Sequence, residues 1–205
     1  MQGYIIHIVP QKNEDIIVYI LTSHKIKKLY RFYGARHSTI QLGKKIDFET
    51  EQNGVFLPKL RNITPINFKF EQNLERLYIW QRYSQLLHRH FLDIQDIDSF
   101  YFDCLDFGAS KINYQNPMRV IIEMYIKLLN HEGRIPQLSH CFICSKPLDH
   151  QISLARAFLP AHTSCLNFNH HFNLQEIISL LKTHSSIHLD DQNILKLYKI
   201  IELGI

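Results

Sequence analysis

The chain has 205 residues, of which 45% are hydrophobic and 20% charged, and this composition is typical of a folded protein rather than a disordered one. No apolar run approaches the roughly 18 residues that a membrane-spanning helix needs. The first residues also lack the basic start and the small-residue cleavage site of a signal peptide. We therefore expect a cytoplasmic protein that does not act at a membrane.

The net charge of +4 is unevenly distributed along the chain. Residues 1–65 contain 10 Lys and Arg against 5 Asp and Glu, whereas residues 66–205 contain 13 against 14. All the excess positive charge therefore lies in the first third of the chain. Such an asymmetry predicts that this part binds a polyanion.

The first 65 residues are predicted to form short strands. Each predicted strand is either apolar and β-branched or alternates apolar with polar residues: 4–9, 15–22, 25–33, 45–51 and 55–57. Gly34 ends the third strand, and the pair Asn53-Gly54 is typical of a hairpin turn. Because little helix separates them, these strands favour a small barrel over an open sheet.

After Pro65 the pattern changes to helical. Residues 71–91 and 97–105 carry apolar residues at helical spacing, and Asn116-Pro117 begins a helix that Gly133 ends. We predict an α+β fold with a five-stranded barrel domain at residues 1–68 and a helical domain at residues 69–205. Two further helices are predicted to be capped at these positions: Asn173, and Asp190 or Asp191.

A loop-rich insert at about residues 138–171 contains a metal-ligand pattern. Its spacing is C-x2-C-x17-H-x2-C, and it consists of Cys141, Cys144, His162 and Cys165. Two residues between ligands let a tight turn direct both side chains at one ion, and the second pair then completes a tetrahedron. Three thiolates and one imidazole suit zinc, and four protein ligands predict a structural rather than a catalytic ion.

Other interpretations of this insert remain open. His140 and His150 compete with His162 for the fourth position, although His162 gives the more symmetrical spacing. The thiols could also be buried without a metal. Cys104 lies on the apolar side of a predicted helix and is interpreted as a core residue.

A basic segment between Ser23 and Ile46 contains seven Lys and Arg and no acidic residue, with aromatic residues between them. Exposed cations beside exposed aromatic rings can follow a phosphate backbone while bases stack on the rings. Alternatively, the rings lie in the core and the lysines only solvate a strand. The predicted DNA-binding residues are Lys25, Lys27, Lys28, Arg31, Tyr33, Arg36, His37, Lys44 and Lys45.

No common catalytic motif occurs in the chain: there is no P-loop, no G-x-S-x-G and no H-E-x-x-H. A two-metal nuclease is an alternative, because five acidic residues cluster in the chain: Asp93, Asp96, Asp98, Asp103 and Asp106. The helical spacing favours a solvated face instead. A further alternative is an interaction scaffold whose barrel binds protein and whose basic charge is incidental.

Several segments together resemble the bacterial recombination mediator family RecO. They occur in that family's order: Glu14-Asp15 between the first two strands, residues 33–38 at the end of the third, Gly133-Arg134-Ile135-Pro136 before Cys141, and the two metal-ligand pairs. The chain departs from the family pattern at His162, where cysteine is usual.

The resemblance implies an N-terminal OB-fold, a helical C-terminal domain and a zinc-binding loop. It implies a non-enzymatic protein of the RecF-type repair pathway that binds single- and double-stranded DNA and anneals complementary strands. It also implies two protein partners, RecR and single-stranded-DNA-binding protein, and a role in loading RecA onto coated strands.

Overall fold

The structure is a computed structural model that describes residues 1–52, 54–166 and 170–205. It contains two compact units, residues 1–117 and residues 118–205. Within the described ranges, every helix is too short or too polar to cross a membrane.

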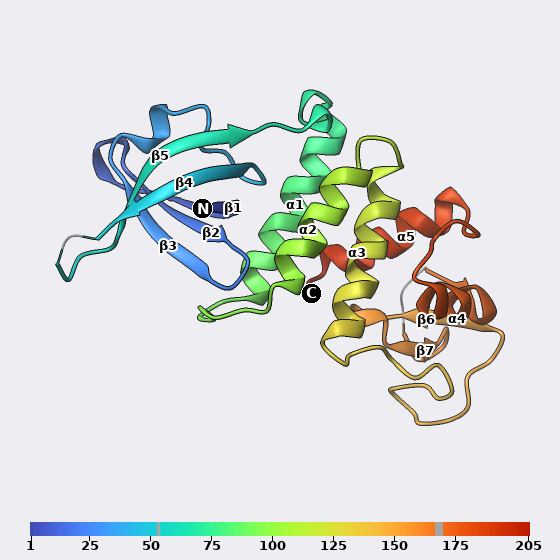
Figure 1. The fold of residues 1–205 in the computed structure, drawn as a ribbon. Coiled ribbons are helices and arrows are strands. Elements are labelled where there is room, and N and C mark those ends of the chain that lie inside the picture. The colour runs from blue at the N-terminus through green and yellow to red at the C-terminus, as the bar shows by residue number, and fades with distance from the viewer. Residues whose placement is uncertain (53, 167–169) are drawn as a thin grey trace. The chain divides into compact units, whose positions relative to one another are not determined.

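The first unit begins with a closed barrel (Figure 1). Its strands are β1 (Gln2–Pro10), β2 (Ile16–Leu21), β3 (Ile26–Arg31), β4 (Lys45–Glu51) and β5 (Lys59–Ile66), arranged in the order β1-β2-β3-β5-β4. All neighbouring strands are antiparallel except β3 and β5, which meet in parallel at one pair, Tyr30 and Lys59. A five-stranded barrel with this strand order is typical of the OB-fold, and the predicted fold class is confirmed.

The barrel interior is filled by alternate, mostly β-branched residues, including Ile5, Val18, Ile20 and Leu29. The fifth strand begins later than the sequence predicts. Residues 55–57 form an exposed turn, in which the Gln52 side chain donates to the carbonyls of Gly54 and Phe56. Asn53, part of the predicted hairpin turn, lies outside the described residues.

A β-bulge in β1 changes which side chains face outward. Ile5 pairs with Ile20, but the next paired residue is His7, opposite Tyr19, so Ile6 is the extra residue. Ile5 and Ile8 therefore pack with the barrel core, while His7 faces outward beside Tyr19.

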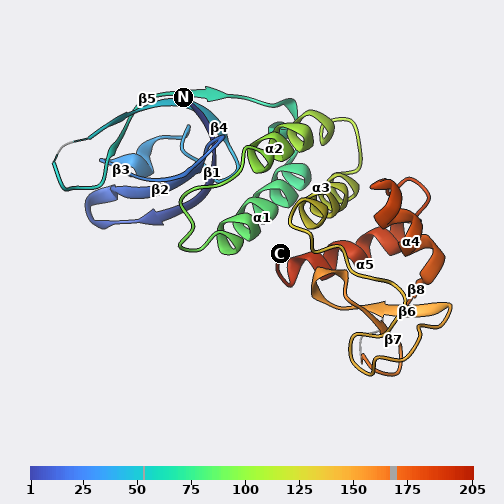
Figure 2. The same ribbon diagram turned by 60° about the horizontal axis from the view of Figure 1, so that its bottom comes forward.

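Helices α1 (Leu74–His90) and α2 (Phe100–Lys111) belong to the same compact unit as the barrel and lie side by side (Figure 2). Trp80 of α1 is buried against Tyr4 of β1, and its indole N–H donates to the Gly43 carbonyl at 2.8 Å. The helical spacing of residues 71–91 places Leu74, Leu77, Tyr78, Leu86 and Phe91 near one apolar face, and this prediction is partly wrong. Leu74 and Tyr78 are exposed, because α1 turns Ile79, Trp80, Tyr83 and Leu87 inward instead.

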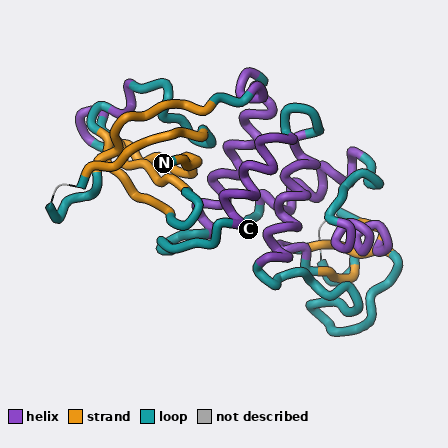
Figure 3. Tube along the Cα trace, viewed as in Figure 1, coloured by secondary structure: helices purple, strands orange, loops and turns teal. Residues whose placement is uncertain are grey.

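The second unit contains α3 from Met118 onward (α3 spans Pro117–His131), a small sheet and two further helices (Figure 3). The sheet has the order β7-β6-β8, from β6 (Gln151–Leu154), β7 (Pro160–His162) and β8 (Phe172–Asn173). Helices α4 (Leu174–Thr183) and α5 (Asp191–Glu202) follow. The predicted caps are confirmed, because Asn173 and Asp190 accept hydrogen bonds from Gln175 and Asn193.

Short 3-10 helices connect these elements: η1 (Lys12–Glu14), η2 (Gly34–Arg36), η3 (Lys69–Gln72) and η4 (Arg156–Phe158). The predicted domain boundary at residue 68 falls directly after β5 and remains a prediction. The compact units divide at residue 117, since α1 and α2 both contact β1.

Candidate nucleic-acid interface and metal centre

A groove of about 640 Å³ runs along the edge of β3, which we call the β3 groove. One wall carries the lysines Lys25, Lys27 and Lys28 of the basic segment. The end of α1 and residues 91–95 also line the groove, as do Leu57 and Pro58 of the β4–β5 connection. The outer face of strands 2 and 3 and the loop between strands 4 and 5 are where OB-folds bind oligonucleotides.

Residues 91–97 are tied to the barrel by backbone hydrogen bonds. The amide of Ile26 donates to the Gln95 carbonyl at 2.8 Å, and the amide of Ile97 donates to the His24 carbonyl at 3.0 Å. Lys25 Nζ lies 3.3 Å from the Asp96 carboxylate, and both side chains are largely exposed. An exposed ion pair contributes little and can exchange partners, so Lys25 remains accessible to a phosphate.

Three ring side chains contact one another in the groove. The His7 and His88 imidazoles are stacked, with centroids 4.0 Å apart and planes 23° apart. The Tyr19 ring meets His88 edge-on at 4.9 Å and His7 at 5.6 Å. Burial lowers the pKa of His7; burial, and then the nearby His7 and Arg89, lower the pKa of His88 to about 4. Both imidazoles are therefore neutral near pH 7.

The two remaining lysines of the wall are open to a ligand. Lys28 Nζ lies 5.6 Å from the centroid of the Tyr19 ring, within range of a cation–π contact. In the described ranges, neither Lys27 nor Lys28 is paired with a carboxylate. Between β3 and the rings, the groove thus combines cations with π-faces.

A second group of rings and cations lies beyond the end of β3, and we call it the end patch: Phe32, Tyr33, Arg36 and Lys59. Phe32 and Tyr33 are 45% and 54% exposed. Lys59 Nζ lies 5.3 Å from the centroid of Phe32, and the Arg36 guanidinium lies 5.4 Å from that of Tyr33. Arg36 also forms an ion pair with Glu14.

Arg31 and His37 lie together, but Arg31 turns toward the barrel. Its Nη1 donates to the Leu60 carbonyl at 3.0 Å, and its Nη2 lies 3.4 Å from His37 Nε2. Of the predicted DNA-binding residues, three thus lie in the β3 groove, two in the end patch, and Arg31 with His37 as a separate pair.

The last two predicted DNA-binding residues are corrected by the structure. Lys45 is buried, with its Nζ 2.6 Å from the Asp106 carboxylate and above the rings of Tyr4 and Phe102. Lys44 Nζ lies 3.6 Å from the Glu71 carboxylate, and both side chains are more than four-fifths buried. Because acidic residues distant in sequence already neutralise them, we omit both lysines from the candidate interface.

The acidic residues between Asp93 and Asp106 do not gather into a metal site. Asp106 accepts from Lys45 and from the Tyr4 hydroxyl, and Asp98 accepts from the Phe100 amide at the start of α2. Within the described ranges, the only group of three or more possible ligands is the cysteine and histidine cluster of the second unit.

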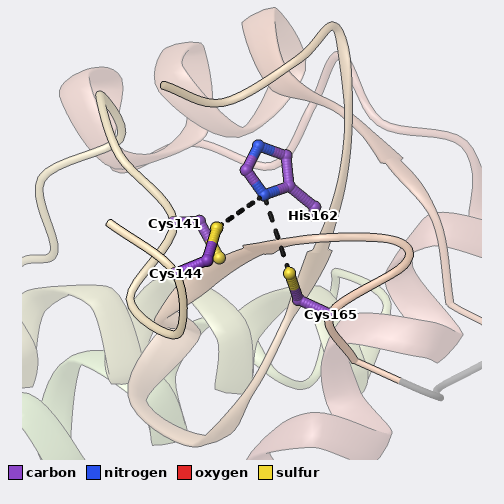
Figure 4. Close-up of side chains that lie close together, drawn as sticks. All are labelled: Cys141, Cys144, His162 and Cys165. Carbon is purple, nitrogen blue, oxygen red and sulfur yellow. Dashed lines mark hydrogen bonds between the residues drawn. The ribbon is translucent and has the colours of Figure 1, made fainter. Parts of the chain in front are cut away.

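That cluster contains the four predicted ligands (Figure 4). One ligand atom from each of Cys141, Cys144, His162 and Cys165 lies within 4.8 Å of all the others. His162 Nδ1 faces the sulfurs, 3.3 Å from Cys144 Sγ and 3.8 Å from Cys165 Sγ. The donor set and its compactness fit a tetrahedral zinc ion without an open position. His140 and His150 are not part of the group.

Local structure prepares these side chains for a metal. His162 Nε2 lies 2.8 Å from the Pro147 carbonyl, which fixes the ring with Nδ1 toward the thiols. The tight turn at Cys141 is closed by the hydrogen bond from the Ser145 amide to the Cys141 carbonyl. Burial opposes ionisation of Cys141, but hydrogen bonds involving the backbone of Cys144, His162 and Ile143 lower its pKa to about 6. A thiolate is the form that binds metal.

Five residues of the candidate interface were not predicted from the sequence: His7, Tyr19, His88, Phe32 and Lys59. His7 and His88 come from elements far apart in the chain, and no spacing in a single sequence links them. Phe32 and Lys59 were detectable only as an exposed ring and a cation on neighbouring strands.

Residues 1–71 match the family model described as RecO N terminal. The match contains the whole barrel and confirms the resemblance to RecO. It supports a RecO-like role in DNA recombination and repair, with DNA and repair proteins as partners in general. No match to the chain was found among curated proteins.

Proposed function

We propose that this chain, whose first 71 residues form a RecO-type N-terminal domain, is a non-enzymatic recombination mediator that holds DNA in the β3 groove. The observation that carries the proposal is the coincidence of three features on one side of the barrel. An OB-fold ligand face, an acid-poor row of lysines and a cluster of rings occur together there.

The lysines supply affinity that does not depend on sequence, because they neutralise phosphates. The rings in the groove and in the end patch supply π-faces on which any base can stack. Binding of this kind serves both single- and double-stranded DNA, and it brings complementary strands together so that they anneal. No bond chemistry is needed for these steps.

Zinc completes the proposal for the second unit. The ion would be held by Cys141, Cys144, His162 and Cys165, and it would stabilise residues 139–166 without taking part in a reaction. We assign the protein partners to the same role: RecR and single-stranded-DNA-binding protein would position the chain on coated strands, where RecA is then loaded.

The test is oligonucleotide binding by fluorescence anisotropy, together with annealing of two complementary labelled strands. If about four phosphates are neutralised, the affinity for a single strand falls with log salt at a slope of about −3. The double variant Lys27→Glu and Lys28→Glu should weaken binding at least about tenfold and slow annealing to the same extent.

The matched control is the double variant Lys12→Glu and Lys69→Glu. It makes the same charge change at two exposed lysines outside the groove and the end patch. If both double variants weaken binding equally, overall charge rather than the groove binds DNA. If the wild-type chain has no DNA affinity but retains repair-protein partners after nuclease treatment, the scaffold interpretation replaces this proposal.

A further inference from the structure

The stacked imidazoles of His7 and His88 are an unusual feature for the lining of a cationic groove. Two such rings 4.0 Å apart cannot both carry a charge without strong repulsion, and the free protein keeps them neutral. Neither ring has a carboxylate partner in the described ranges. Near pH 7 the pair is thus a set of uncharged hydrogen-bonding groups, and an anion beside them would favour their protonation.

We propose that His7, His88 and Lys28 form a phosphate site in the β3 groove, and that a phosphate binds there together with a proton. The site rests on the proposed function, because it takes the phosphodiester of a bound single strand as its ligand. A free phosphate has the same chemistry and is distinguished below.

The geometry supports this site in three ways. The bulge in β1 turns His7 outward, opposite Tyr19. The last turn of α1 brings His88 onto His7, and the Tyr19 ring contacts His88 edge-on and His7 at a tilt. The Lys28 ammonium lies over the Tyr19 ring, 5.6 Å from its centroid, and Lys28 lines the same groove.

The charged groups around the His7–His88 pair decide whether phosphate binding favours or opposes protonation of the imidazoles. The other charged or titratable groups that line the groove or act on the pair are Tyr19, Lys25, Lys27, Lys28, Arg89 and Asp93. Cations predominate, so they oppose protonation while the groove is empty. A phosphate screens them and places negative charge beside the rings, which favours the imidazolium form. The protonated ring then donates a charge-assisted hydrogen bond to the phosphate.

Only one proton is expected for each site, because two charged imidazoles stacked 4.0 Å apart would repel each other. The affinity for DNA should therefore rise as pH falls, by up to tenfold for each pH unit between the His pKa values of the bound and free states. The probe must carry phosphates, as both duplex and single strands do, and its bases must not bind protons themselves. The thymine base does not titrate in this pH range. Oligothymidylate is thus a suitable probe.

The experiment uses the full chain and oligothymidylate at constant ionic strength, from pH 8 to pH 5.5. Calorimetry in two buffers with different ionisation enthalpies gives the number of protons taken up. We expect about one proton for the wild type, and close to none for His88→Gln and His7→Gln. His88→Phe keeps the ring packing without the proton, so it serves if a glutamine variant does not fold.

The matched control is His24→Gln, which removes an exposed histidine at the β2–β3 turn that does not line the groove. This variant should retain the wild-type proton uptake. Equal uptake in His88→Phe, His7→Gln and the wild type would overturn the proposal, as would wild-type binding with no uptake at all.

A second arm separates the two phosphate sources. Inorganic phosphate is titrated while the imidazole NMR signals of His7 and His88 are followed. If the His7 or His88 ring becomes protonated when the oligonucleotide is added at micromolar concentration, the result supports the strand site. Protonation by inorganic phosphate in a chain that binds no oligonucleotide would leave the phosphate site standing and refute the proposed DNA function. No response to either ligand would overturn the site.

Discussion

The ammonium of Lys45 on β4 and the carboxylate of Asp106 on α2 form an ion pair at 2.6 Å. The Tyr4 hydroxyl donates to the same carboxylate oxygen at 2.6 Å, and burial together with this hydrogen bond raises the pKa of Tyr4 well above its ordinary value. A lysine of the basic segment thus holds a helix to the barrel instead of facing a ligand.

Replacing Lys45 should therefore affect stability and not DNA binding. In Lys45→Met, Asp106 loses its cation in a half-buried position, and we expect the free energy of unfolding to fall by about 2 kcal/mol. Urea unfolding measures this loss. Lys27→Met provides the opposite pattern, with weaker oligonucleotide binding and a stability change within about 0.5 kcal/mol. Similar behaviour of the two variants would contradict the assignment.

The neutral His88 imidazole makes stability depend on pH. Its pKa is about 4 in the folded protein, against an ordinary value of 6.5. Between these values the unfolded chain binds more protons than the folded chain, so the free energy of unfolding is highest above pH 6.5 and decreases as pH falls toward 4. In His88→Phe, the free energy of unfolding should decrease less steeply between pH 6.5 and pH 4, as measured by urea unfolding at several pH values. Parallel curves would show that His88 does not contribute.

Removal of the metal should unfold a limited part of the chain. A chelator should release one zinc ion per chain and expose the amides of Cys141 and Ser145 to hydrogen exchange, while the amides of the barrel stay protected. Zinc binding contributes on the order of 10 kcal/mol to the folding of such sites. Cys144→Ser should reproduce the effect. The control is Cys104→Ser, which changes a buried thiol of α2 and should retain the metal. If the amides of Cys141 and Ser145 exchange at the same rate with and without chelator, the ion is not structural.

The exposed ring of Phe32 should act as a stacking surface. Phe32→Ala is expected to weaken oligothymidylate binding about tenfold, because base–aromatic stacking contributes about 1–3 kcal/mol per base. Binding to duplex should change little, since paired bases are not free to stack. Tyr114→Ala removes a ring that is 80% exposed in the same unit but outside the end patch. Anisotropy with both ligands distinguishes a stacking role from a general loss of surface.

The sequence predicted the parts of this protein that local patterns determine. Alternation of apolar residues located the strands, and Pro117, Asn173 and Asp190 located helix starts, because caps and strand faces depend on residues close together in the chain. The metal ligands were predicted for the same reason, since each pair lies within one turn. The prediction of a strand at residues 55–57 was wrong because a short apolar run is also compatible with an exposed turn.

The groove could not be predicted in the same way. Its lysines were recognised, but whether a lysine faces solvent or a carboxylate depends on partners such as Asp106, 61 residues from Lys45. The buried face of α1 was misplaced because Leu74 and Tyr78 follow helical spacing as well as Trp80 does. The contact of His7 with His88 depends on tertiary packing alone.

The extra residue in β1 has one more consequence. Strand side chains alternate with a period of two, so the insertion of Ile6 reverses the phase of everything that follows it in the strand. In a regular pairing that kept Ile6, Ile6 itself would lie opposite Tyr19, and His7 would lie opposite Val18 and face the apolar interior. The chemical character of the outer wall is therefore decided by the count of residues in a strand, and not only by their identity.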